Sequence, residues 1–122
     1  MADKKYPTFQ IVEFVDDSHV VGRNCGSDVL LGNVFTRVVR QEFTNLKSNE
    51  PQMTQTVLAE DVVIELTGIE LFRRSFALLA SGHTARLTLA GRDLKRLFAL
   101  RSVLGDGTYI AIETPQGAQR EG

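Results

Sequence analysis

The 122-residue sequence contains a single cysteine, no tryptophan and no long apolar run. Its one cysteine, Cys25, cannot form an internal disulfide and cannot supply a cysteine metal site alone. Tryptophan is absent, and aromatic residues make up 7%. No apolar run reaches the roughly 18 residues that a membrane-spanning helix needs, and the first residues lack the apolar centre of a signal peptide. We therefore expect a soluble, cytoplasmic protein, in which the sequence indicates no role for Cys25.

The overall composition is that of a globular domain. Hydrophobic residues make up 43% and charged residues 24%, so the chain can bury a core. The formal net charge is −1, which excludes an overall field that attracts nucleic acid or membranes but leaves a local patch open. Its length suits one domain over residues 1–122. We expect the core to span about residues 8–114, with flexible ends at 1–7 and 115–122.

Positive charge is concentrated in one part of the chain. Residues 73–104 hold seven Lys and Arg against one acid, a net of +6, whereas residues 1–72 hold six against eleven, a net of −5. Such a separation could give the folded domain one basic side. Alternatively, the cations could be separately solvated and form ion pairs with acidic residues from the first half of the chain, because folding brings distant segments together. With His83, the seven cations are the candidates for binding a partner or RNA: Arg73, Arg74, Arg86, Arg92, Lys95, Arg96 and Arg101.

Alternation of apolar and polar residues is the dominant pattern and predicts short strands. The predicted strands cover residues 9–15, 19–21, 29–40 with a break at Gly32-Asn33, 56–66 with a polar middle, 84–90 and 107–114. Residues 46–55 have the composition of a loop. Strands of this length with Gly and Asp turns favour an all-β barrel or sandwich.

Two segments have apolar residues at helical spacing. Residues 69–80 end at Ser81-Gly82, and residues 93–104 end before Gly105, with Asp93 placed to cap the second helix. Spacing alone cannot separate helix from strand in such short runs. Both assignments therefore stay open at this level.

One stretch resembles a known family. Thr67-Gly-Ile-Glu-Leu-Phe-Arg-Arg74 is similar to the Thr-Gly-(Val/Ile)-Glu-Met-Phe-(Arg/His)-Lys signature in the second domain of elongation factor Tu, a β-barrel shared by translational GTPases. The spacing from Phe72 to Gly82 and Gly91 agrees, and the similarity spans about residues 9–114. The resemblance implies a small antiparallel β-barrel, closed or partly open. It also implies at most one or two helical turns, so that both candidate helices shorten to about one turn each.

The sequence also departs from that family. It has no Gly-x-x-x-x-Gly-Lys-(Ser/Thr) phosphate-binding loop, so we expect no GTP binding by this chain. Glu70 is kept from the signature. The family's Glu-Asn, on the surface that meets the aminoacyl end of transfer RNA, is replaced by His83-Thr84.

No residue pattern indicates catalysis, a metal or a cofactor. The two histidines, His19 and His83, lack metal-ligand spacing, and no base is signalled for Cys25. The adjacent carboxylates at 16–17 and 60–61 would face opposite sides of a strand, so we expect solvated turns there. The phenylalanines at 72, 76 and 98 are expected in the core.

These observations lead us to expect a non-enzymatic, stand-alone binding module that docks on a protein or ribonucleoprotein partner linked to translation. One alternative is an RNA-binding domain that uses the basic surface, whose affinity would fall steeply with salt. Another is an immunity or accessory protein that mimics a translation-factor domain. A small-molecule enzyme is the least supported. Self-association stays open, because an incompletely closed barrel can pair its edges between copies.

Overall fold

The computed structural model describes residues 5–44 and 52–115, and these residues are the ones discussed below. The predicted flexible ends and the loop at 46–55 fall largely outside them. The strands are β1 (Thr8–Phe14), β2 (His19–Asn24), β3 (Val29–Leu30), β4 (Val34–Thr44), β5 (Gln52–Leu71), β6 (Arg74–Ser75), β7 (Leu78–Leu79), β8 (Thr84–Ala90) and β9 (Thr108–Glu113). The helices are α1 (Leu94–Phe98) and the 3-10 helix η1 (Ala99–Val103).

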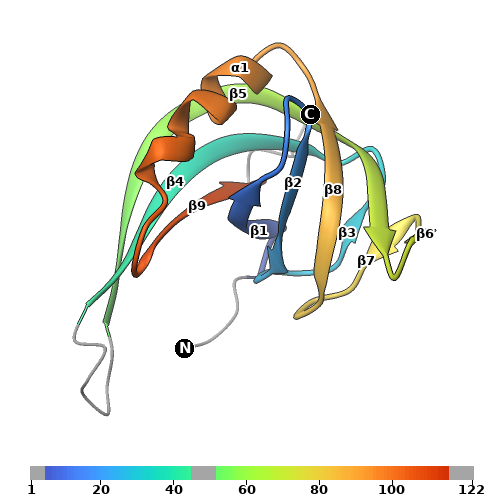
Figure 1. The fold of residues 1–122 in the computed structure, drawn as a ribbon, viewed down its shortest axis with the longest axis horizontal. Helices are drawn as coiled ribbons and strands as arrows, with labels where there is room; N and C mark the ends of the chain where they lie inside the picture. The colour runs from blue at the N-terminus through green and yellow to red at the C-terminus, as the bar shows by residue number, and fades with distance from the viewer. Residues whose placement is uncertain (1–4, 45–51, 116–122) are drawn as a thin grey trace.

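Six antiparallel strands form a closed β-barrel, which confirms the predicted fold class (Figure 1). The strand order is β4-β9-β1-β2-β8-β5, and β5 pairs back onto β4 to complete the ring. Strand β6 extends this sheet beyond β5, and β3 and β7 form a separate two-stranded sheet. Closure matters because it removes the exposed sheet edges wherever the ring is complete.

Strand β5 runs unbroken over 20 residues, which the sequence did not predict. The middle of this segment, Ala59-Glu60-Asp61, was expected to interrupt it, and residues 52–55 were expected in a loop. Instead, two register shifts against β4 absorb the polar residues, and Asp61 has a positive φ of 58° beside one of them. A β-bulge bends a strand without ending it, so the chain continues around the barrel.

The two candidate helices have different outcomes. Residues 69–80 form no helix: they complete β5 and then form β6 and β7, and the Phe76 amide donates to the Ile69 carbonyl at 2.9 Å. Residues 94–103 form ten helical residues, more than the single turn expected there. Asp93 precedes this helix but its side chain does not cap it. The carboxylate instead accepts the Val63 amide of β5 at 2.7 Å.

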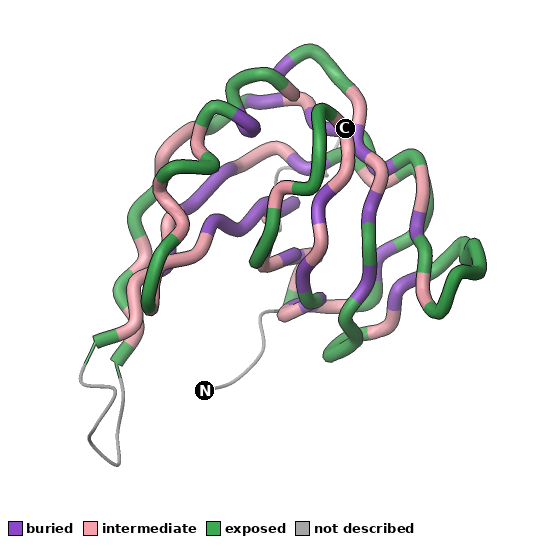
Figure 2. The backbone as a smooth tube through the Cα atoms, in the orientation of Figure 1, coloured by how far each residue is buried: buried purple, intermediate pink, exposed green. Residues whose placement is uncertain are grey.

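The core fills the barrel interior with alternate residues of the strands (Figure 2). In β8, for example, Ala85, Leu87 and Leu89 are buried and their neighbours are not. Leu97 and Phe98 of α1 belong to the same cluster, so the helix covers one end of the barrel. Neither helix has the length or apolar character needed to cross a membrane.

Candidate functional site

The eight predicted site residues are all exposed, but they do not gather on one side. Arg92, Lys95, Arg96 and Arg101 lie on or beside α1 and η1, Arg73 and Arg74 lie at the β5–β6 turn, Arg86 lies in β8, and His83 lies in the β7–β8 turn. Figure 1 shows β6 and η1 at opposite sides of the barrel. The concentration of charge along the sequence therefore becomes two separate basic surfaces in space.

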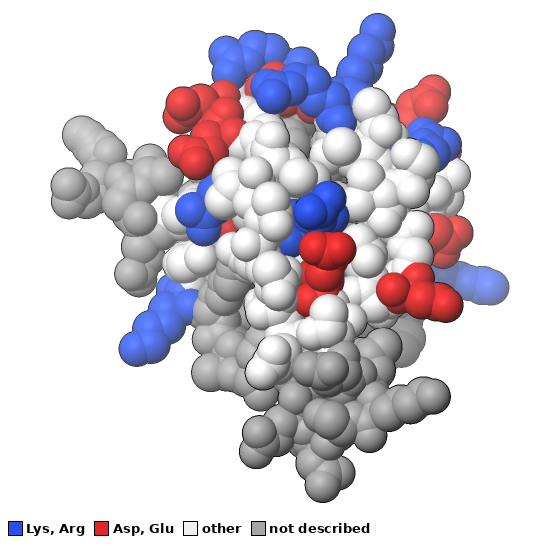
Figure 3. All heavy atoms as spheres, turned by 90° about the vertical axis from the view of Figure 1, so that its left-hand side faces the viewer, with Lys and Arg blue, Asp and Glu red and all other residues white. Residues whose placement is uncertain are grey.

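The first basic surface, here called the helix surface, consists of Arg92, Lys95, Arg96 and Arg101. Two of its cations are held by the buried carboxylate of Asp93: Arg92 Nε lies 3.2 Å from Oδ2, and Arg96 Nη1 lies 3.3 Å from Oδ1. Both arginines stay more than 60% exposed. Figure 3 shows basic side chains along the upper margin of the molecule with acidic ones beside them. The helix surface is therefore partly neutralised.

Asp93 is expected to stabilise the fold only while it is ionised. Its hydrogen bond from the Val63 amide is the largest cause of a lowered pKa, and the bonds from Arg92 and Arg96 add to it. The unfolded chain keeps the ordinary value of 3.8, so this stabilisation is complete above that pH and is lost as the pH falls through the folded-state pKa. Asp93→Asn should therefore be less stable than wild type at neutral pH, and the difference should shrink below pH 3.8.

Denaturant unfolding of both proteins over this pH range measures the effect. Asp17→Asn, which alters an exposed carboxylate in the β1–β2 turn, is the control and should change the free energy of unfolding little at neutral pH. An equal difference between Asp93→Asn and wild type at all pH values would contradict the assignment.

A cleft of about 470 Å³ adjoins the helix surface between the β1–β2 turn and the helices. Leu94, Phe98 and Ala99 supply apolar walls, and Lys95 and Arg101 supply the cations. Asp17 also lines it. The Phe98 ring is held in place by an edge-to-face contact with Phe14, at 5.0 Å between centroids. This cleft has room for a small apolar group that carries a negative charge.

The second basic surface, which includes Arg73 and Arg74 at the β5–β6 turn, adjoins exposed apolar side chains. Leu30 of β3 pairs with Leu78 of β7, and their exposed fractions are 60% and 42%. Leu31 and Phe76 beside them are also exposed. These four residues form the β3–β7 patch. The sequence analysis did not predict this patch. The doublets Leu30-Leu31 and Leu78-Leu79 were a signal for it, because adjacent residues of a strand point to opposite faces and one core cannot bury both.

Phe72 lies at the tip of the β5–β6 hairpin and is 92% exposed, so its expected place in the core was wrong. Leu71 pairs with Arg74, which leaves Phe72 and Arg73 as a two-residue turn with φ values of 52° and 65°. Such turns favour Asn-Gly, because side chains with a Cβ disfavour positive φ. Phe98 is buried as expected, whereas Phe76 is exposed. We call Phe72, Arg73 and Arg74 the hairpin surface.

A groove of about 480 Å³ continues from this region. Leu30 and Leu31 line both the β3–β7 patch and the groove, and Tyr6, Pro7 and Asn33 are among its other residues. The groove therefore enlarges the concave area that a partner could contact beside β3.

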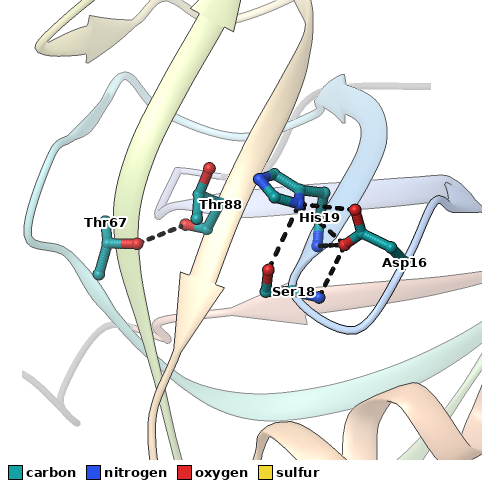
Figure 4. A network of polar contacts seen from close by, with 5 residues as sticks. All are labelled: Asp16, Ser18, His19, Thr67 and Thr88. Atoms are coloured by element: carbon teal, nitrogen blue, oxygen red, sulfur yellow. Dashed lines mark hydrogen bonds and ion pairs between the residues drawn. The ribbon is translucent and has the colours of Figure 1, made fainter.

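Asp16, Ser18 and His19 form a network at the β1–β2 turn that superficially resembles a catalytic triad (Figure 4). Asp16 Oδ1 and Ser18 Oγ both contact the same ring nitrogen of His19, Nδ1, at 2.8 and 3.3 Å. A triad requires the carboxylate and the hydroxyl on different ring nitrogens. Asp16 also accepts the backbone amides of Ser18 and His19, and the first of these is the largest cause of its lowered pKa. The arrangement is that of a turn, as expected for residues 16–17.

The remaining candidates lie apart. His83 is exposed in the turn before β8, and Cys25 is half-buried after β2, where Arg23 Nη1 lies 3.8 Å from its Sγ. Arg86 stands opposite Glu70 in the β5–β8 register. Within residues 5–44 and 52–115, no three His, Cys, Asp or Glu side chains are grouped so that they could hold one metal ion.

Comparisons of this chain with protein-family models, with curated proteins and with solved structures found no match.

Proposed function

We propose that this chain is a non-enzymatic β-barrel module that docks on a protein partner through the hairpin surface and the β3–β7 patch. The observation that carries the proposal is Phe72, a nearly fully exposed aromatic residue on a turn with left-handed backbone. Exposed aromatic residues that enter a partner's pocket often dominate binding energy. Backbone strain of this kind concentrates at functional sites.

The β3–β7 patch supports the same surface. Its four side chains expose between 42% and 60% of their area, and contiguous exposed apolar area marks interaction sites more often than scattered single residues do. A partner that covered this patch would remove leucine and phenylalanine from water. The hydrophobic effect would then supply most of the binding free energy.

Charge defines the chemistry of the partner. Arg73 and Arg74 are exposed beside Phe72, and guanidinium groups bind carboxylates through two parallel hydrogen bonds, a bidentate contact. We therefore propose a partner with an apolar pocket and an acidic rim. The resemblance noted for residues 67–74 makes translation components, including ribonucleoproteins, the first place to look. A protein that mimics a translation-factor domain would use the same contacts to occupy another factor's site.

The helix surface is the place where RNA would bind, and it is the weaker candidate. Two of its four cations already hydrogen-bond to Asp93, and no exposed aromatic residue accompanies them. Stacking of bases on aromatic side chains is the usual complement to phosphate contacts in single-stranded RNA recognition. RNA binding is therefore an outcome that the following test must separate from protein docking.

Replacing Phe72 and Arg73 by Asn and Gly should stabilise the free protein and weaken docking together. Asn-Gly adopts positive φ at lower cost, so we expect the free energy of unfolding to rise by about 1 kcal/mol. Loss of an aromatic anchor is worth about 2 kcal/mol, which weakens partner binding roughly 30-fold. Thermal unfolding and a binding titration measure the two effects on one variant.

The partner is identified by affinity capture from a lysate, with and without nuclease and at two salt concentrations. The matched variant, Lys95→Glu with Arg101→Glu, alters the helix surface and leaves the hairpin unchanged. A protein that survives nuclease, binds wild type and the helix variant, and is lost with the hairpin variant supports the proposal. RNA that is lost with the helix variant and retained by the hairpin variant contradicts it.

A further inference from the structure

The cleft beside the helix surface is lined by one face of the helical segment and by the β1–β2 turn. Residues three or four positions apart lie on the same side of a helix, and the lining residues of α1 and η1 follow this spacing. These residues are Leu94, Lys95, Phe98, Ala99 and Arg101. The helical segment therefore brings apolar and cationic side chains together in one concave site at the end of the barrel (Figure 1).

Both walls of this cleft are held in place by contacts within the chain. On the helix side, Phe98 is only 7% exposed, and its ring contacts Phe14 edge to face at 5.0 Å between centroids. On the turn side, Asp16 Oδ1 accepts the amides of Ser18 and His19 at 2.9 and 3.0 Å. A site that is already formed loses little conformational entropy when a ligand binds. The cleft is therefore suited to a small ligand.

The two cations of the cleft differ from the other cations of the helix surface. Arg92 and Arg96 are both paired with the same buried carboxylate. In the part of the chain that the structure describes, no acidic side chain lies within ion-pair distance of Lys95 or Arg101. Arg101 Nε donates to the Phe98 carbonyl at 3.3 Å, which holds the guanidinium beside the apolar wall. The Nη nitrogens of Arg101 and the Lys95 ammonium are therefore available to an anion.

We propose that this cleft binds an apolar monocarboxylate, such as a medium-chain fatty acid. The carboxylate binds Lys95 and Arg101, because a guanidinium can donate two parallel hydrogen bonds to it. The hydrocarbon chain packs on Leu94, Phe98 and Ala99, where each methylene group removed from water adds to the affinity. The cleft volume of about 470 Å³ falls within the range of about 300–1,000 Å³ that is typical of small-molecule sites.

Charge favours a carboxylate over a phosphate in this cleft. Its charged side chains are Asp17, Lys95 and Arg101, two cations against one acid, which leaves a net charge of +1. A monocarboxylate neutralises that charge, whereas a phosphate dianion brings excess negative charge beside Asp17. The inference is independent of the docking proposal, because the helix surface and the hairpin surface lie on different sides of the barrel.

Titration of the wild-type chain with octanoate, followed by the NMR shifts of backbone amides, tests both binding and its location. We expect saturable shifts at residues 16–18 and 94–101, with a Kd below about 1 mM. Leu30 and Leu31, which line the separate groove beside β3, should show no comparable shifts. A Kd above about 1 mM, or shifts centred on that groove, would overturn the proposal.

Two variants of equal net charge test whether octanoate occupies the cleft. Ala99→Glu places a carboxylate in the lining, and the matched variant Ser102→Glu places one on η1 outside the lining. We expect Ala99→Glu to weaken octanoate binding at least about tenfold and Ser102→Glu to weaken it less than about twofold, because solvent and salt screen the more distant charge. Circular dichroism checks that both variants fold. Equal weakening by two folded variants would place the ligand elsewhere and overturn the proposal.

Octan-1-ol, which has the same chain length as octanoate but no carboxylate, tests the charged end of the site. The variant Lys95→Gln with Arg101→Gln should lower the affinity for octanoate about tenfold more than the affinity for octan-1-ol. Asp17→Asn should strengthen octanoate binding about threefold, because it removes a like charge from the cleft. Octanoate binding that is unchanged by the loss of both cations would overturn the assignment.

Discussion

Replacing Gly22 by alanine is expected to lower the free energy of unfolding by about 3 kcal/mol, a large part of the stability of a domain this size. A Cβ atom at Gly22 would overlap the backbone carbonyl oxygen of Gln10 and would lie 2.7 Å from the Phe9 ring. Gln10 is paired with both β2 and β9. Its carbonyl therefore cannot move without disturbing two ladders of the barrel.

Gly82→Ala is the matched control. Gly82 has a φ of +87°, but a Cβ there would meet nothing within 4 Å. Alanine at this position should cost only the conformational penalty of about 1 kcal/mol. Denaturant unfolding of both variants gives the comparison. Equal losses would mean that the close approach of β1 and β2 at Gly22 is not what requires glycine.

Replacing Arg37 by leucine is the second change with a large expected effect. Arg37 Nη2 and Nε lie 2.7 and 2.9 Å from Oε1 of Glu113, whose side chain is completely buried. Burial opposes the charge on Arg37, but the hydrogen bonds and attraction from Glu113 prevail and raise its pKa. Without the guanidinium, the buried carboxylate of Glu113 keeps its hydrogen bond from Thr8 but loses the ion pair with Arg37. We expect a loss of about 3–5 kcal/mol in the free energy of unfolding.

Two further variants separate this effect from general damage. Arg40→Leu removes a neighbouring cation whose partner Glu42, at 3.5 Å, has a side chain that is 42% exposed, and it should cost less than about 1 kcal/mol. The double variant Arg37→Leu with Glu113→Leu removes both charges and should recover most of the stability. A double variant as unstable as the single one would show that packing, rather than the broken ion pair, accounts for the loss.

Strand character was predictable because it depends on neighbours in the sequence. The alternation of residues 84–90 predicted a strand with Ala85, Leu87 and Leu89 on one face, and all three are buried. The break at Gly32-Asn33 was also placed correctly, between β3 and β4. The continuity of β5 was not predictable from its polar middle, because the bulge near Asp61 exists only through pairing with β4.

The sequence predicted which residue types would be exposed better than it predicted where on the barrel they would lie. The cations of residues 73–104 are exposed as expected, yet the barrel carries them around its circumference, so that Arg73 and Arg96 are on different surfaces. Phe72 was expected in the core because most phenylalanines are buried. Only the pairing of Leu71 with Arg74 places Phe72 at a turn, outside the core.

The sequence by itself determined that this chain is a small β-rich domain with its positive charge in one segment, because composition and alternation are local properties. Tertiary structure alone decided the closure of the ring through β4 and β5 and the exposure of Phe72. Each of these depends on which distant strands become neighbours and in what register. Register is set by the packing of the whole barrel and not by any single segment.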